Sequence, residues 1–101
     1  MSHSKLTSRE AVLKAIQEFD RLGREAFLAK YGFGKAKSYF LIHDGKRYDS
    51  KAIYGVAYGY EYPEEGPLTW RDFVGGKLLV QPELISRGFR VENIKIKKPI
   101  P

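Results

Sequence analysis

Hydrophobic residues recur at helical spacing along the first part of the chain. They follow Thr7-Ser8-Arg9-Glu10, which fits a capping box in which the Thr7 hydroxyl accepts a hydrogen bond from the backbone N–H of Glu10. The pattern predicts an amphipathic helix over about residues 8–22, ended by Gly23. The positions that carry this pattern are Ala11, Val12, Ala15, Ile16, Phe19 and Leu22.

A second, shorter helix leads into a glycine-rich loop and a hairpin. The helix is predicted over residues 24–31 and the loop over residues 32–38. Residues 39–43 and 46–48 are expected to form two strands on either side of Asp44-Gly45. This pair is typical of a two-residue hairpin turn, because both residues tolerate a positive φ.

A third helix is predicted over about residues 50–60, with Asp49 or Ser50 at its N-cap. Gly55 and Gly59 lie inside this helix, and each costs about 1 kcal/mol relative to alanine. A close approach of another element would explain both glycines. The positions expected to face inward are Ala52, Ile53, Val56, Ala57 and Tyr60.

The last third of the chain alternates turns with short elements. Residues 69–73 are expected to form a helical turn capped by the threonine at its start, and Gly75-Gly76 ends it. Residues 77–87 have helical spacing, with Pro82 either in the first turn or at a kink. Residues 89–96 alternate between apolar and polar side chains, which predicts a strand with one face in water.

These elements predict an α+β fold in a single small domain. A short antiparallel sheet, made of the hairpin and the C-terminal strand, is expected to be flanked by three to four helices. The domain is expected to span residues 7–96, between a flexible lead-in over residues 1–6 and a tail over residues 97–101. A chain of 101 residues allows one modest core.

The composition narrows the class of protein. The chain has no cysteine, which excludes a disulfide scaffold, a thiolate zinc site and a cysteine nucleophile, and which fits a reducing compartment. No apolar run approaches the ~20 residues of a membrane span, and the N-terminal segment lacks the apolar core of a signal peptide. We therefore expect a cytoplasmic domain with no membrane partner.

The formal net charge is +6, and it is unevenly distributed. Residues 30–51 carry six basic against two acidic side chains, and residues 69–101 carry seven against three. Between them, residues 52–68 carry three glutamates and no basic side chain. Such a distribution favours one basic face and a polyanionic partner, with nucleic acid as the first candidate.

The glycine loop and hairpin form the more informative basic segment. Glycines let the backbone approach a phosphate closely, and aromatic rings between basic residues suit stacking on a base or sugar. Lys51 is the best single candidate for a phosphate contact, because helix N-termini attract anions and Lys51 falls in the first turn of the third helix. For the aromatic candidates, burial in the core is the alternative interpretation. The candidate DNA-binding residues are Lys35, Lys37, Tyr39, Lys46, Arg47, Tyr48, Ser50, Lys51, Trp70, Arg71, Gly75, Gly76 and Lys77.

Few residues suggest catalysis. The two histidines, His3 and His43, lie far apart in the sequence, and the clustered His and Asn residues of an HNH nuclease motif are missing. Asp44 and Asp49 flank the hairpin, but no Glu-x-Lys element follows in an order that suits a restriction-type metal nuclease. We therefore expect a non-catalytic domain with no cofactor and no metal site.

From Tyr39 onward the order of residues matches a family pattern. Its most specific pieces are Tyr48-x-x-Lys51-Ala52-Ile53, Phe73-x-Gly75-Gly76 and Gly88-Phe89-x-Val91. The chain resembles the N-terminal head domain of ScoMcrA-like proteins, which are modification-dependent HNH restriction endonucleases. The leading Ser-Arg-Glu-Ala-Val helix also fits that domain, so the resemblance covers nearly the whole chain.

The resemblance implies a DNA-recognition module placed ahead of a nuclease. The implied partners are double-stranded DNA, either unmodified or methylated, hydroxymethylated or phosphorothioated, and an HNH nuclease domain in cis or in trans. It leaves open whether the head reads a modified base, grips the DNA backbone or contacts another domain. The alternative hypothesis is a protein-interaction or assembly module of a defence or phage-related protein, with no direct base readout.

Overall fold

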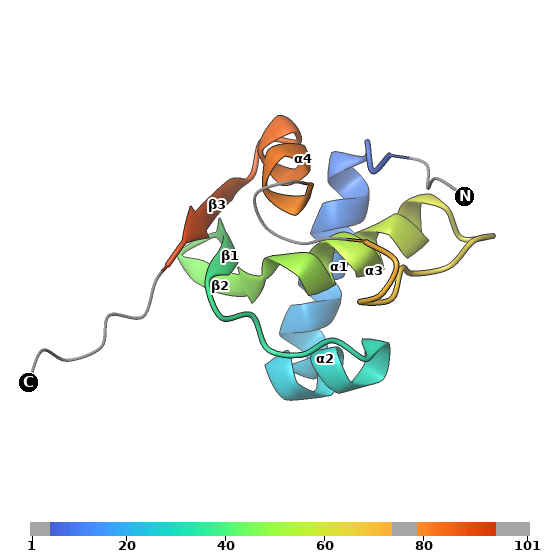
Figure 1. Ribbon diagram of the computed structural model, residues 1–101, viewed down its shortest axis with the longest axis horizontal. Helices are drawn as coiled ribbons and strands as arrows, with labels where there is room; N and C mark the ends of the chain where they lie inside the picture. Colours follow the sequence, from blue (N-terminus) through green and yellow to red (C-terminus); the bar gives the residue numbers. More distant parts are fainter. Residues whose placement is uncertain (1–4, 74–78, 95–101) are drawn as a thin grey trace, which may run out of the picture.

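A computed structural model describes residues 5–73 and 79–94 of the chain (Figure 1). Helices and strands are mixed along this part, so the predicted α+β fold is confirmed. The elements, in chain order, are α1 (Arg9–Leu22), α2 (Arg24–Tyr31), β1 (Tyr39–His43), β2 (Lys46–Asp49), α3 (Ser50–Glu61), α4 (Val80–Ser86) and β3 (Arg90–Asn93).

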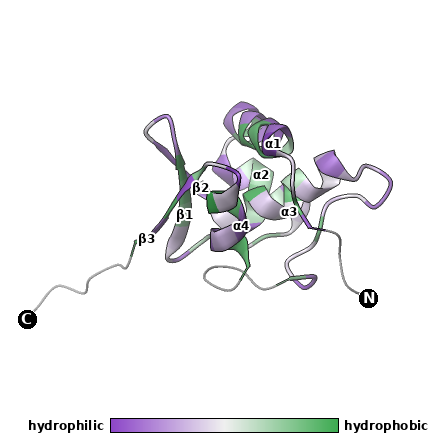
Figure 2. Cartoon of the chain, turned by 90° about the horizontal axis from the view of Figure 1, so that it is seen from above, coloured by the Kyte–Doolittle hydropathy of each residue, from purple (hydrophilic) through white to green (hydrophobic). Residues whose placement is uncertain are grey.

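The three strands form one antiparallel sheet in the order β2-β1-β3. Leu41 at the centre of β1 lies opposite Tyr48 of β2 and Val91 of β3, so these three buried side chains share the inner face. The hairpin turn is the predicted one, with φ of 50° at Asp44 and 75° at Gly45. The helices cover one side of the sheet, which lies at one end of the molecule (Figures 1 and 2).

Helix α3 lies at the centre of the fold and is buried over most of its circumference. Tyr54 and Tyr58 are 3% and 0% exposed, whereas Tyr60, which the sequence placed inward, is 38% exposed. Because nearly all of α3 is covered, helical periodicity identifies its inner positions poorly. In Figure 2 the hairpin tip and the loop that follows α3 are hydrophilic.

The two glycines of α3 confirm the expected close approach. A Cβ atom at Gly55 would lie 2.7 Å from Cζ of Phe33 and 2.9 Å from the carbonyl oxygen of Leu68. A Cβ atom at Gly59 would lie 2.6 Å from the backbone nitrogen of Pro67. The loops on either side of α3 therefore pack directly on its backbone.

The first helix begins one residue away from the predicted cap. The Ser8 hydroxyl, not that of Thr7, accepts the capping hydrogen bond, from the backbone N–H of Ala11 at 3.0 Å. Thr7 instead donates from its backbone N–H (2.8 Å) and from its hydroxyl to the Glu61 carboxylate at the end of α3. The predicted Thr7 cap is wrong because this charged acceptor, 54 residues away in the sequence, binds both Thr7 donors.

The predicted caps of α3 are also replaced by distant partners. Asp49 occupies the N-cap position, but its side chain makes no capping hydrogen bond and is turned toward Arg24 and the backbone of Ala36. The Ser50 hydroxyl donates to the carbonyl oxygen of Tyr39 at 3.0 Å. Both side chains therefore join α3 to neighbouring segments rather than closing its first turn.

The C-terminal elements are of the predicted types, but the helix and the strand are shorter than predicted. Residues 69–72 form a hydrogen-bonded turn, in which the Asp72 carboxylate accepts from the Thr69 N–H at 2.7 Å, so the acidic side chain closes the turn. Pro82 lies in the first turn of α4. The helix predicted over residues 77–87 is shorter at both ends, because α4 begins at Val80 after its N-cap Leu79 and ends at Ser86. The strand predicted over residues 89–96 is also shorter, since β3 spans Arg90–Asn93 and Ile94 lies outside it. The Gly75-Gly76 break lies outside the described residues.

One core unites the helices with the inner face of the sheet. Leu6, which the sequence analysis assigned to the lead-in, is 0% exposed and belongs to this core. Within residues 5–73 and 79–94, no helix has the length and apolarity needed to cross a membrane.

Candidate nucleic-acid interface

A groove of about 410 Å³ lies where three separate segments of the chain meet. The glycine loop after α2 contributes Gly34 and Lys35, the start of α3 contributes Lys51, and the turn after the acidic loop contributes Trp70. In Figure 1 the glycine loop runs along one side of α3 before it enters β1. The fold thus brings together three of the predicted site residues, Lys35, Lys51 and Trp70.

Asp49 fixes the position of the loop that forms one wall of this groove. Its carboxylate accepts hydrogen bonds from Nε (2.9 Å) and Nη2 (2.8 Å) of Arg24 and from the backbone N–H of Ala36 (2.8 Å). Only 3% of the Asp49 side chain is exposed, so this bidentate pair is well shielded on the carboxylate side. The hydrogen bond from Arg24 to Asp49 also raises the pKa of the guanidinium.

Lys51, at the start of α3, also lines this groove. Its Nζ donates to the carbonyl oxygen of Trp70 at 2.8 Å and lies 5.0 Å from the centre of the Phe73 ring. Partial burial lowers the pKa of Lys51, because desolvation disfavours the charged ammonium. Its place in the first turn of α3 adds a small penalty from the helix dipole. An anion in the groove would relieve both costs.

Trp70 and Arg71 form an exposed pair beside the groove. Trp70 is 52% exposed, which excludes the core-anchor interpretation of this residue. The Arg71 guanidinium carbon lies 5.1 Å from the centre of the Trp70 ring, within the range of a cation–π contact. A ring and a cation side by side at the surface suit a stacked base and its phosphate.

Tyr48 and Ser50 do not reach the surface, and the structure thereby corrects their assignment as DNA contacts. Tyr48 is 1% exposed, its hydroxyl donates to Asp20 at 2.8 Å, and its ring packs edge-on against Phe19. Burial, and then the hydrogen bond to Asp20, raise the pKa of Tyr48 well above its usual range. Ser50 is likewise 1% exposed. Tyr48 is a core residue because its strand position faces Leu41 and the helices.

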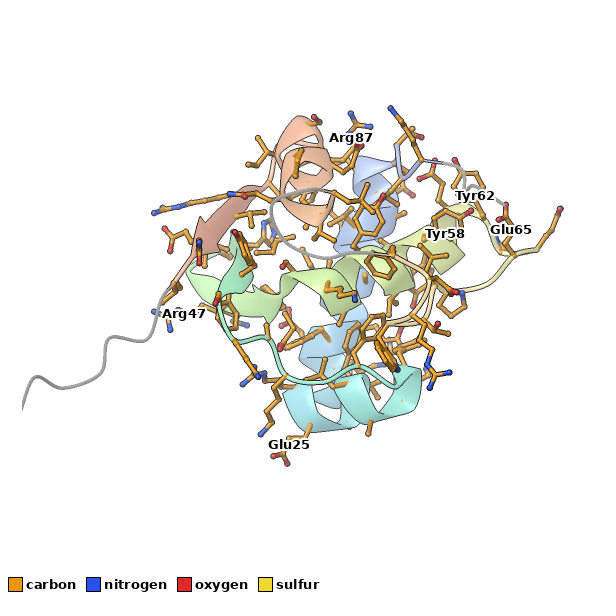
Figure 3. The ribbon with its side chains drawn as sticks, in the orientation of Figure 1. Glu25, Arg47, Tyr58, Tyr62, Glu65 and Arg87 are labelled. Atoms are coloured by element: carbon orange, nitrogen blue, oxygen red, sulfur yellow. The ribbon has the colours of Figure 1, made fainter. Side chains whose placement is uncertain are left out.

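The hairpin carries a second group of basic side chains, outside the groove. Lys46 and Arg47 are exposed, and Arg47 extends away from the sheet (Figure 3). Lys46 lies 3.9 Å from Asp20, and Lys35 in the groove lies 3.6 Å from Glu25. Within the described part of the chain, Arg47 forms no ion pair, and neither does the exposed Lys37 of the glycine loop.

The remaining predicted residues divide into two groups. Tyr39 is half-buried in the central strand β1, and its hydroxyl accepts a weak hydrogen bond from Asn93 of β3 at 3.4 Å, so it contacts the neighbouring strand rather than the groove. Gly75, Gly76 and Lys77 lie outside the described residues. Among the residues that are described, no group of three His, Cys, Asp or Glu side chains is arranged to hold a metal ion.

Comparison with known proteins decides the family. The family model described as "ScoMcrA-like, N-terminal head domain" matches residues 4–93, which is most of the chain. The chain belongs to the ScoMcrA-like N-terminal head domains. The resemblance inferred from the sequence motifs is therefore confirmed.

A solved structure supports the same conclusion for the head domain. It is described as the Type IV phosphorothioation-dependent restriction endonuclease ScoMcrA, and it shares 36% sequence identity with a TM-score of 0.65. The match covers 89% of this chain and 13% of that chain, so the head domain spans a small part of the endonuclease's length. Comparison with curated proteins gives no match.

Sequence reasoning missed two groups of residues in the head domain. Asp49 contacts Arg24, which lies 25 residues away in the sequence, and Ala36, which lies 13 residues away. No local sequence pattern predicts these contacts. The second group centres on Glu18, which is 1% exposed although it is charged. Glu18 lies on the same inward face of α1 as Ala11 and Ala15. A carboxylate at an inward position is uncommon, and this could have indicated a buried polar cluster from the sequence.

Proposed function

We propose that the head domain is a non-catalytic DNA-binding module that targets an associated HNH nuclease domain, in cis or in trans. The observation that carries this proposal is the groove, in which Lys35, Lys51 and Trp70 converge from three segments of the chain. The membership of the chain in the ScoMcrA-like head domains supports the association with a nuclease domain.

The groove suits one strand of a DNA backbone. Lys35 and Lys51 both line the groove and offer cations to a phosphate. Gly34 has open space around its Cα, because nothing lies within 4 Å of a Cβ built there. Trp70 and Arg71 then meet the adjoining sugar or base. Stacking of a base on an aromatic ring contributes about 1–3 kcal/mol, and phosphate contacts give affinity without sequence preference.

The form of DNA that is bound is a separate part of the proposal. The solved relative is described as phosphorothioation-dependent, and that dependence belongs to an endonuclease much longer than this chain. Phosphorothioated, methylated and hydroxymethylated duplexes are therefore to be compared with an unmodified duplex of the same sequence. A tenfold preference corresponds to about 1.4 kcal/mol and would identify the form that the head domain reads.

The test is a binding titration of each duplex at two salt concentrations. For backbone binding, affinity falls as salt rises, and each lost phosphate contact lowers the salt slope by about one. We expect this loss for Lys37→Gln and Arg71→Gln, which remove exposed charges. Lys14→Gln on α1 is the matched control, because it removes the same charge on a helix that does not line the groove, whereas Lys37 and Arg71 directly follow lining residues in the chain. Affinity that is independent of salt, or an equal loss in the control, would overturn the proposal.

A further inference from the structure

The sheet has an outer face that no described helix covers. Leu41 of β1 is buried toward the helices, so its neighbours Phe40 and Ile42 face the other side of the sheet. The described helices lie on the inner side (Figure 2). Phe40 and Ile42 are half-buried, and among the described residues neither belongs to the core or to the partly buried side chains packed against it. Two apolar side chains therefore lie on the outer face.

The strand register places an arginine on each side of Ile42. Arg47 of β2 and Arg90 of β3 lie directly opposite Ile42 in the two pairings, so the three side chains share the outer face. Because neighbouring strands lie about 4.8 Å apart, the Cα atoms of the two arginines are roughly 10 Å apart. Both arginines are exposed, Arg90 with 71% of its side chain. This row of the sheet thus presents two cations with an apolar side chain between them.

The next row of the outer face carries two carboxylates, and an arginine engages each of them. Phe40 lies opposite Asp49 of β2 and Glu92 of β3. Asp49 is bound by Arg24, whose guanidinium carbon lies 6.0 Å from the centre of the Phe40 ring. The Glu92 carboxylate accepts a hydrogen bond from Nη2 of Arg90. Three arginines therefore stand against two carboxylates, and the face has an excess of positive charge.

Asp49 also connects the outer face with the groove. It lines the groove and at the same time lies opposite Phe40 in the sheet. Only 3% of its side chain is exposed, so it presents little negative charge to a ligand that passes over it. Arg47 is two residues away along β2, which corresponds to about 7 Å. A phosphate chain that leaves the groove at Asp49 therefore reaches the cations of the outer face.

The outer face has the chemistry of a contact with a nucleic-acid backbone. Within the described part of the chain Arg47 forms no ion pair, so it is available to a phosphate. The pair of Arg90 with Glu92 lies at the surface, where such pairs contribute little to stability. A phosphate can replace Glu92 as the partner of Arg90, because guanidinium binds both anions in the same bidentate way. The apolar side chain of Ile42 then meets the sugar between two phosphates.

We propose that the outer face of the sheet, with Arg47 and Arg90 on either side of Ile42, binds the DNA backbone and continues the contact made by the groove. This inference rests on the proposed DNA-binding function and extends it to β3, which contributes no residue to the groove. It also gives Glu92 a role against binding, because this carboxylate competes with the phosphate for Arg90.

Charge variants test the inference on the duplex that binds most tightly among those compared above. We expect Arg90→Gln to weaken binding severalfold and to lower the salt slope by about one. Glu92→Gln is expected to strengthen binding about two- to fivefold, because it frees Arg90 and removes a negative charge that faces the phosphates. Arg21→Gln on α1 is the matched control, since it removes an exposed arginine from the helical layer. Unchanged affinity in both Arg90→Gln and Glu92→Gln, or a loss of the same size in the control, would overturn the inference.

A second measurement locates the contact on the sheet. The side-chain methyl groups of Ile42 and the indole N–H of Trp70, which is the sole tryptophan, are followed by NMR in the 101-residue chain during the same titration. We expect both signals to shift together as the duplex is added. A shift at Trp70 without one at Ile42 would confine the DNA to the groove and contradict the inference. A shift at Ile42 that follows protein concentration in the absence of DNA would make the face a contact between copies of the chain, which also contradicts it.

The groove variants separate this inference from the proposed function. If Lys37→Gln and Arg71→Gln weaken binding while Arg90→Gln and Glu92→Gln leave it unchanged, the inference fails and the proposed function stands. If only the two sheet variants change the affinity, the outer face stands as a DNA contact and the groove loses its role. If no duplex binds in a salt-dependent manner, the proposed function fails, and the inference that rests on it fails with it.

Discussion

Asp49 is the residue that joins the parts of the groove, and its loss should be felt in stability. Its carboxylate accepts two hydrogen bonds from Arg24 and one from the backbone of Ala36, with 3% of the side chain exposed. Asp49→Asn keeps the size but removes the charge and one acceptor oxygen. We expect the free energy of unfolding to fall by about 2–3 kcal/mol, measured by urea denaturation. Lys37→Gln in the glycine loop should change the free energy of unfolding by less than about 0.5 kcal/mol. Equal losses in the two variants would contradict the role of Asp49 in joining the parts of the groove.

Glu61 gives a pH-dependent prediction at the same scale. Burial acts to raise its pKa, but hydrogen bonds from the hydroxyl and N–H of Thr7 and from the N–H of Ser8 outweigh burial and lower it. A carboxyl whose pKa is depressed by folding stabilises the protein above its unfolded pKa, and this contribution is lost as pH falls through the folded value. We therefore expect Glu61→Gln to be less stable than the native chain at pH 7 and to approach it below pH ~4. A stability difference that does not change between these pH values would exclude the linkage.

At the scale of elements, the glycines show where segments touch. Gly55→Ala places a methyl group 2.7 Å from Phe33 and 2.9 Å from the Leu68 carbonyl oxygen. Because the carbonyl belongs to the backbone and moves little, we expect a loss of about 1–3 kcal/mol. For a chain of this length that lowers Tm by roughly 4–8 °C per kcal/mol, which calorimetry detects. Gly34→Ala is the matched control, since nothing lies within 4 Å of its Cβ position, and an equal fall in Tm would refute the packing argument.

The elements also show how far the sequence alone could reach. The Asp44-Gly45 turn and the stop at Gly32 were predicted because their signals are local, and their positive φ values agree. The partners of Thr7 and Asp49 were not, because Glu61 and Arg24 lie 54 and 25 residues away. The candidate site divides in the same way. Its basic and aromatic residues could be named from the sequence, but the burial of Tyr48 could not, because it depends on the pairing of β1 with β2 and on their packing against the core.

At the scale of the molecule, a basic and an acidic side chain lie at opposite ends of the fold. Arg47 on the hairpin lies at one end of the fold, and Glu65, which accepts a hydrogen bond from Tyr58 at 2.6 Å, lies at the other (Figure 3). The groove and the hairpin form two basic regions of the fold, and the hairpin is the one that lies far from Glu65. A DNA strand that contacts both would cross the end of the fold that lies opposite Glu65.

This arrangement predicts additive losses of DNA affinity. Lys46→Gln with Arg47→Gln removes both basic side chains of the hairpin, and Lys35→Gln with Arg71→Gln removes one cation from the groove and one from its edge. We expect each pair to lower the salt slope of binding by about two, because each removes two phosphate contacts. The four-residue variant should show the sum of the two losses within about 0.5 kcal/mol, since the regions share no side-chain partner. If the groove pair alone removes all binding and the hairpin pair changes nothing, the contact is confined to the groove, and the strand does not extend across the sheet.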